Sequence, residues 1–144
     1  MTDRPLAILL VEDNPADVRL AREAFRTSKL QSVLSVVKDG VEAMDFLHKT
    51  GSYVDAAKPD LIFLDLNLPR KDGREVLAEI KGDAELKRIP VVILTTSRAD
   101  RDVTASYNLN ANCYVVKPAD LDQFFEVVHS TEQFWLTTVT RAPK

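Results

Sequence analysis

The sequence predicts an α/β fold in which five parallel strands form one doubly wound sheet with helices on both faces. Five short apolar segments recur along the chain, and segments with helical spacing of apolar residues follow them. An apolar segment without alternation is typical of a strand that is buried on both faces of a parallel sheet. Strands that alternate with helices in this way indicate such a sheet.

The first strand is expected at residues 6–11, where six apolar residues follow one another. A helix should begin after it, with Asn14 as its N-cap and Pro15 at its first position. The apolar residues of this helix recur at intervals of three and four, which predicts one buried face. They are Val18, Ala21 and Phe25. A second strand is expected at residues 32–37.

Asp39-Gly40 should end the second strand and precede an amphipathic helix that stops near Gly51. The third strand is expected at residues 61–65, and it ends in a carboxylate. Because burying an unpaired charge is costly, an acid at this position either caps the next turn or has a function. A turn and a short third helix follow, and this helix should end at Gly82.

The fourth strand is expected at residues 89–94, with Pro90 near its entry, where a missing N–H does least harm. A weakly patterned helix at residues 103–109 and a short strand at residues 114–116 should follow. The last helix is expected over about residues 121–136, because its aromatic and aliphatic residues recur at helical spacing.

The 144 residues fit a single domain, residues 1–144, with a core at about 6–136 and a flexible tail at 137–144. The net charge of −3 argues against general binding of nucleic acids or membrane surfaces. No apolar segment approaches the roughly 20 residues that span a bilayer. The single Cys113 cannot form an internal disulfide, so we expect a cytoplasmic protein.

Side chains with complementary chemistry lie at or just after the ends of the predicted strands. All parallel strands end at one edge of the sheet, and open α/β sheets bind their ligands at this edge. In chain order these side chains are Glu12, Asp13, Asp65, Thr95 and Lys117. Three carboxylates so close together would repel one another without a cation, and oxygen-only ligands suit Mg²⁺. A lysine and a hydroxyl can hold a phosphoryl group, so the set is suited to phosphorylation of a carboxylate. A plain salt-bridge cluster is the alternative.

Four motifs, in this order, resemble the receiver domain of two-component response regulators over about residues 6–136. They are Val11-Glu12-Asp13-Asn14, Leu64-Asp65-Leu66-Asn67-Leu68-Pro69 with Asp72-Gly73, Leu94-Thr95-Thr96-Ser97, and Lys117-Pro118. The resemblance implies a flavodoxin-like (βα)5 fold. It also implies a switch that takes a phosphoryl group from a sensor histidine kinase and then changes its partner-binding surface. Such a protein is a signalling protein, not an enzyme with a separate substrate.

The same resemblance implies roles for individual residues at the first and third strands. Asp65 would accept the phosphoryl group. Mg²⁺ would be held by the side chains of Glu12, Asp13 and Asp65, together with the backbone carbonyl of Asn67.

At the fourth and fifth strands, the resemblance implies Thr95 as the switch hydroxyl and Lys117 as the cation that contacts the phosphoryl group. Tyr114 would change rotamer together with Thr95. The bond between Lys117 and Pro118 would be cis, an isomer that X–Pro bonds adopt at small cost. Thr96 departs from the Ala or Gly of many relatives, and we expect its larger side chain to narrow access to the phosphoryl group.

The last helix and the residues after it point to partners. Few residues follow this helix, so we expect a stand-alone receiver that contacts neither nucleic acid nor membranes. The segment 129–136 and the residues around Glu12 resemble the small regulators paired with bacterial phytochromes, which indicates a bacteriophytochrome as the kinase. A homodimer is expected through the fourth helix, the fifth strand and the fifth helix, with aromatic residues at its interface. They are Phe124, Phe125, Phe134 and Trp135.

Three other functions are compatible with an acidic strand end. A haloacid-type phosphatase would need a second Asp two residues after the nucleophile, where this chain has Asn67. A flavin or dinucleotide carrier would need a Gly-rich first loop, and residues 12–15 contain no glycine. A receiver-like module that is never phosphorylated is disfavoured by the intact acidic set. Labelling by a small phosphodonor with Mg²⁺ separates it from a true receiver.

Overall fold

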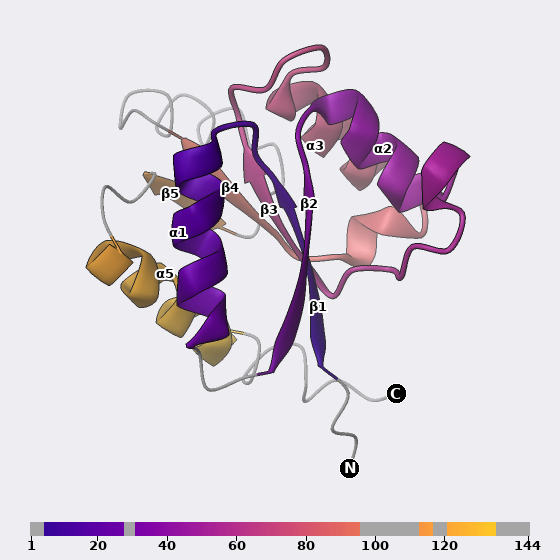
Figure 1. The fold of residues 1–144 in the computed structure, drawn as a ribbon. Coiled ribbons are helices and arrows are strands. Elements are labelled where there is room, and N and C mark those ends of the chain that lie inside the picture. The colour runs from indigo at the N-terminus through magenta and orange to yellow at the C-terminus, as the bar shows by residue number, and fades with distance from the viewer. Residues whose placement is uncertain (1–4, 28–30, 96–112, 117–120, 135–144) are drawn as a thin grey trace.

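The computed structural model describes residues 5–27, 31–95, 113–116 and 121–134. Its centre is a five-stranded parallel sheet with the strand order β2-β1-β3-β4-β5 (Figure 1). The strands are β1 (Leu6–Val11), β2 (Ser32–Val37), β3 (Leu61–Asp65), β4 (Val91–Thr95) and β5 (Cys113–Val116). The predicted α/β fold is confirmed, and the first three strands have the predicted bounds. The fourth strand begins only after Pro90, because proline has no N–H for the ladder.

Helices cover both faces of this sheet. They are α1 (Pro15–Arg26), α2 (Gly40–His48), α3 (Gly73–Gly82) and α5 (Leu121–Phe134), with short 3₁₀ helices η1 (Gly51–Tyr53) and η2 (Leu86–Arg88). Figure 1 shows α1 and α5 on one face and α2 and α3 on the other. The helix predicted at residues 103–109 lies outside the described residues. None of the described helices has the length and apolar character that a membrane span requires.

Local features explain where α1 begins and where α2 ends. Asn14 caps α1, because its side-chain oxygen accepts hydrogen bonds from the N–H groups of residues 16 and 17 at 2.9 and 3.3 Å. Pro15 occupies the first helical position, so both predictions for this helix start are confirmed. The predicted stop of α2 near Gly51 was too late. The helix ends at His48, because Lys49 adopts the left-handed conformation, with φ 57°, that usually closes a helix.

Each face of the sheet packs against its own hydrophobic core. On the face of α1 and α5, the rings of Phe25 and Phe63 meet edge-on with their centroids 5.4 Å apart. On the opposite face, Phe46 packs against Tyr53 with the same centroid distance of 5.4 Å. All five residues of β3 are buried, so this strand joins the two cores. Packing from both sides therefore fixes the position of Asp65 at the end of β3.

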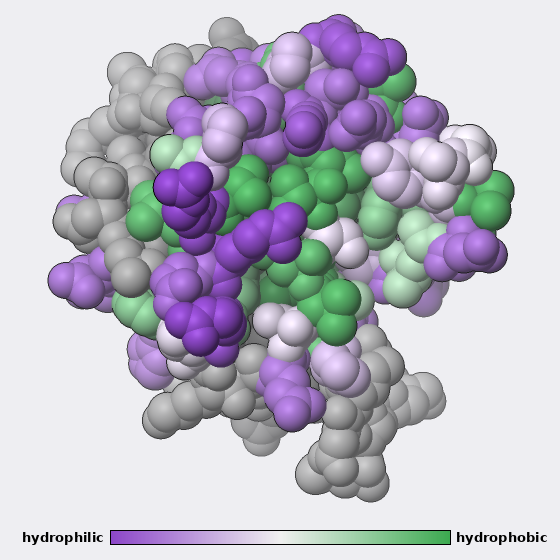
Figure 2. Space-filling view, viewed as in Figure 1, coloured by the Kyte–Doolittle hydropathy of each residue, from purple (hydrophilic) through white to green (hydrophobic). Residues whose placement is uncertain are grey.

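The edge of the sheet at β2 is apolar. Figure 2 shows hydrophobic side chains between the two helical layers, where Figure 1 places β2. Val33 is 57% exposed there. A groove of about 230 Å³ beside it is lined by Pro5, Ala7, Ile8, Val33, Ser35, Phe46, Ala57 and Pro59. Because its lining includes the start of β1, this groove lies away from the carboxyl ends of the strands, where the polar residues gather.

Candidate metal and phosphorylation site

Three acidic residues meet at the carboxyl end of the sheet. β1 and β3 are neighbours, and Val11 pairs with Leu64 in their register. Glu12 and Asp13 follow β1 directly, and Asp65 ends β3. Carboxylate oxygens of these three acids all lie within 4.8 Å of one another. The structure therefore brings together the carboxylates that the sequence predicted to share a site.

Two of these three carboxylates are buried. Glu12 is 1% exposed and Asp65 is 2% exposed, whereas Asp13 is exposed. The N–H of Asn14 donates to Oε2 of Glu12 at 3.0 Å, and the N–H of Asn67 donates to Oδ1 of Asp65 at 3.1 Å. These two bonds orient the carboxylates but add no full positive charge. A divalent cation with oxygen ligands fits this donor set, because it would offset the repulsion among the acids.

The loop between β3 and α3 is anchored close to Asp65. Asp72 caps α3 in a capping box with Glu75. The N–H of Gly73 donates to the carbonyl oxygen of Leu66 at 3.0 Å. A Cβ atom on Gly73 would lie 2.3 Å from the carbonyl oxygen of Asp65, which is far too close for any side chain. The start of α3 therefore approaches the acidic strand end as closely as only glycine allows.

Replacing Gly73 by Ala should destabilise the fold by about 1–3 kcal/mol, because the added methyl group must push α3 away from β3. We expect phosphodonor labelling to slow as well, since the loop ahead of α3 would move with it. Thermal unfolding measures the first effect. The matched control is Gly82→Ala, where a Cβ would meet nothing within 4 Å. Equal melting temperatures for Gly73→Ala and the wild type would contradict this packing argument.

The residues predicted at β4 and β5 are placed in part. Leu94 pairs with Asp65, so Thr95 ends β4 at the same edge as the acids. Tyr114 lies in β5 and pairs with Ile93. The structure describes the backbone of Thr95 and Tyr114 but not their side chains, so the predicted switch stays a prediction. The remaining predicted residues of this set lie outside the described residues. They are Thr96, Lys117 and Pro118.

The aromatic residues predicted at a dimer interface belong to α5 and its end. Phe125 is half-buried and packs against the core that also contains Val128. Phe124 and Phe134 lie in α5, but their side chains are not described. Trp135 lies outside the described residues. Phe125 therefore faces the core of its own chain at least in part.

Two polar features beside the site were missed by the sequence prediction. The capping box of α3 could have been found, because Asp72 and Glu75 have the spacing of its signature. The other is an ion pair in which Nη1 of Arg70 donates to Oδ2 of Asp39 at 3.2 Å. These two residues are 31 positions apart. No local pattern indicates such a contact.

Comparison with protein families identifies the fold's relatives. The profile described as the response regulator receiver domain matches residues 8–129. Response regulator Rcp1 of Synechocystis sp. is 54% identical over 136 residues, which cover 94% of this chain and 92% of the relative. The probable methanogenesis regulatory protein FilR2 of Methanothrix harundinacea is 38% identical over 134 residues, which cover 92% of this chain and 84% of the relative.

Solved structures agree with this comparison. The phosphorylated cyanobacterial phytochrome response regulator RcpA superposes with a TM-score of 0.84 at 54% identity, covering 94% of this chain and 97% of that one. The Mn²⁺-bound form of Rcp1 superposes with a TM-score of 0.83 at 53% identity, covering 97% and 100%. The bacteriophytochrome response regulator AtBRR gives a TM-score of 0.79 at 44% identity, covering 92% and 96%.

Proposed function

The chain belongs to the response regulator receiver domain family, whose members act in two-component signalling. We propose that Asp65 is the residue of this chain that becomes phosphorylated. The observation that carries this proposal is the cluster of Glu12, Asp13 and Asp65 at the end of a fully buried β3. Asp65 would accept the phosphoryl group from a histidine kinase, and the phosphorylated form would present a changed partner-binding surface.

The chemistry follows from the carboxylates. An oxygen of Asp65 forms a bond to phosphorus while the bond from phosphorus to the imidazole nitrogen of the kinase phosphohistidine breaks, and the imidazole leaves. The side chains of Glu12, Asp13 and Asp65 would hold Mg²⁺, together with the carbonyl of Asn67. That ion would supply positive charge to the phosphoryl oxygens as they approach the carboxylates. The Mn²⁺-bound structure of Rcp1 supports a divalent cation for this family.

Residues at the ends of β4 and β5 complete the proposal. Lys117 would contact the phosphoryl group, and Pro118 would follow it across a cis bond. Thr95 ends β4 at the same edge as Asp65, and its hydroxyl would form a hydrogen bond to the phosphoryl group. Tyr114 would then turn inward, so phosphorylation would bias two existing conformations. Thr96 would narrow the access of water to the phosphoryl group.

The remaining parts of the proposal concern the chain as a whole. We propose a single receiver domain over residues 1–144, with its core at about 6–136 and a flexible tail at 137–144. It would work in the cytoplasm, and its own phosphotransfer and dephosphorylation would be the only reactions that it catalyses. A bacteriophytochrome is proposed as the kinase, because the relatives RcpA and AtBRR are response regulators of phytochromes.

Labelling with a small phosphodonor tests the proposal. The purified protein should gain one phosphoryl group in the presence of Mg²⁺ and none when the cation is chelated. Intact-mass measurement reports the gain, and profiling against purified histidine kinases then identifies the physiological donor. A protein that binds Mg²⁺ but never gains a phosphoryl group would be a receiver-like module, and this outcome would overturn the proposal.

A homodimer through the helix expected at residues 103–109, β5 and α5 is a further expectation. The expected interface residues are spread along this helix: Phe124 and Phe125 lie near the start of α5, Phe134 ends it, and Trp135 follows it in the sequence. Large aromatic side chains on one surface are typical of the central residues of interfaces. Sedimentation equilibrium should show a dimer that the double substitution Phe134→Ala and Trp135→Ala converts to a monomer. A wild-type monomer at micromolar concentrations, with and without phosphodonor, would contradict this prediction.

A further inference from the structure

The loop that carries Asn67 contains a strained turn. Arg70 has a φ of 68°, a left-handed conformation that residues other than glycine rarely adopt. The N–H of Lys71 donates to the carbonyl oxygen of Pro69 at 2.7 Å. A hydrogen bond that spans three residues with a positive φ at the middle one describes a strained γ-turn. Such a turn persists only where its surroundings hold it, and turns of this kind gather at functional sites.

Asp39 holds this turn from the start of α2. It is 7% exposed, and its two carboxylate oxygens have different partners. Oδ1 accepts a hydrogen bond from the N–H of Glu42 at 2.8 Å and so caps α2. Oδ2 accepts the hydrogen bond from Nη1 of Arg70 at 3.2 Å. The buried carboxylate of Asp39 therefore joins the N-terminus of α2 to the strained turn, and its bond to Arg70 is a charge-assisted hydrogen bond.

Gly40 brings α2 and the loop into direct contact. A Cβ atom on Gly40 would lie 2.1 Å from the carbonyl oxygen of Lys71 and 2.6 Å from the Cβ of Lys71. The backbone at Lys71 therefore occupies the space that a side chain at residue 40 would need. The ion pair and this close packing act on adjacent residues of one turn, so together they fix the loop against α2.

We propose that Asp39, Gly40 and Arg70 form a clamp that positions the carbonyl of Asn67 for the divalent cation. This inference rests on the proposed function, which assigns that carbonyl to the cation. Only a few residues separate Asn67 from the turn at Arg70. The direction of the Asn67 carbonyl therefore depends on how the turn is held. The three clamp residues are positioning residues, because they act on the site through the loop.

The substitution Arg70→Ala gives the sharpest test, because charge and clamp predict opposite results. Removal of a positive charge from the loop that carries Asn67 should by itself strengthen cation binding. Loss of the clamp should weaken Mn²⁺ and Mg²⁺ binding by about tenfold, the lower end of the cost of losing a supporting group around a metal. Calorimetric titration of both cations measures the change. Affinity equal to or above that of the wild type would overturn the inference.

Further variants separate positioning from general stability. Arg70→Lys keeps the charge and a group that can donate to Asp39, so its cation affinity should lie between those of Arg70→Ala and the wild type. Gly40→Ala moves the loop without changing any charge and should also weaken cation binding. For each variant, saturating cation should restore the labelling rate, because the reacting carboxylate is intact. Adding Asp39→Asn to Arg70→Ala should lower the cation affinity no further, since both substitutions remove the same ion pair.

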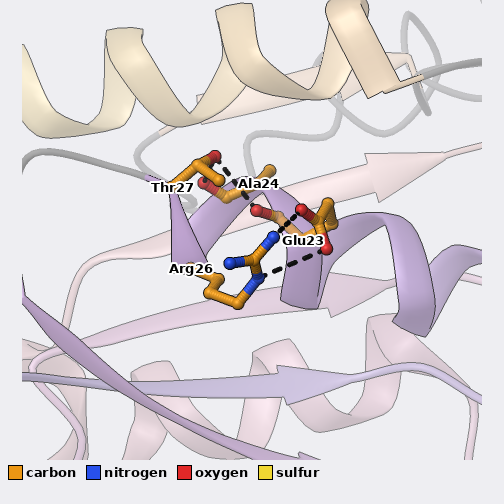
Figure 3. Close-up of polar contacts among 4 residues, drawn as sticks. All are labelled: Glu23, Ala24, Arg26 and Thr27. Carbon is orange, nitrogen blue, oxygen red and sulfur yellow. Dashed lines mark hydrogen bonds and ion pairs between the residues drawn. The ribbon is translucent and has the colours of Figure 1, made fainter.

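A control pair lies on α1, where the exposed Arg26 forms an ion pair with Glu23 (Figure 3). The Arg26 guanidinium donates to the carboxylate of Glu23, and this hydrogen bond raises the pKa of Arg26. Arg26→Ala should leave cation affinity unchanged. If the wild type neither binds cations nor accepts a phosphoryl group, the proposed function fails. If it does both and Arg70→Ala matches it, only the clamp fails.

Discussion

Asp65→Asn should reduce phosphodonor labelling to background while the domain still folds. Asparagine is almost the same size as aspartate, so it fills the position at the end of β3, which is 2% exposed, as Asp65 does. Its amide oxygen can still accept the N–H of Asn67, which donates to Oδ1 of Asp65 at 3.1 Å in the wild type. The amide lacks the anionic oxygen that attacks phosphorus, so no aspartyl phosphate can form. Intact-mass measurement and thermal unfolding test the two parts of this prediction.

A control for Asp65→Asn lies at the other end of the same strand. Asp60 directly precedes β3, and its Oδ2 accepts the N–H of Ala7 at 2.9 Å. Asp60→Asn also changes a carboxylate to an amide that can keep its hydrogen bond, so it should label like the wild type. Full labelling of Asp65→Asn would show that the phosphoryl group goes elsewhere. Loss of labelling in a folded Asp60→Asn would show that labelling depends on strand stability.

The sheet and the acidic cluster could be predicted because both follow from short-range sequence patterns. Continuous apolar segments indicate strands that are buried on both faces, and β3 is buried at every position. Parallel strands end at one edge, so an acid after β1 and an acid at the end of β3 must lie close together. The observed separation of at most 4.8 Å among their oxygens confirms that expectation.

The clamp could not be predicted, because it depends on tertiary contacts between residues far apart in the sequence. Asp39 was expected only to end a strand, yet its carboxylate is shared between the cap of α2 and Arg70. The positive φ values of Lys49 and Arg70 gave no signal, since positive φ is usually taken by glycine. At Lys49 the hydrogen bonds that close α2 override this preference. At Arg70 the contacts of the turn with Asp39 and Gly40 override it.

Asp13→Ala should have two effects of opposite sign. Loss of one of three carboxylates should weaken Mg²⁺ binding by more than about a hundredfold, beyond the cost of changes around a metal's direct ligands. Labelling should fall with it. In the absence of cations, however, the variant should be more stable by about 1 kcal/mol, the interaction of two unit charges near 4 Å in water. Asp13 is exposed, so the effective dielectric near it is high.

The matched control is Asp55→Ala, which removes the same charge from an exposed loop residue outside the cluster. This control should change neither cation affinity nor labelling. A difference between the two variants would therefore come from the loss of a carboxylate at the cation site and not from the change in net charge. Calorimetric titration with Mg²⁺ and thermal unfolding with and without chelator measure both effects. Because cation binding stabilises only the folded state, Mg²⁺ should raise the melting temperature of the wild type and of Asp55→Ala but not of Asp13→Ala. Unchanged Mg²⁺ affinity in Asp13→Ala would show that the three carboxylates do not form the cation site.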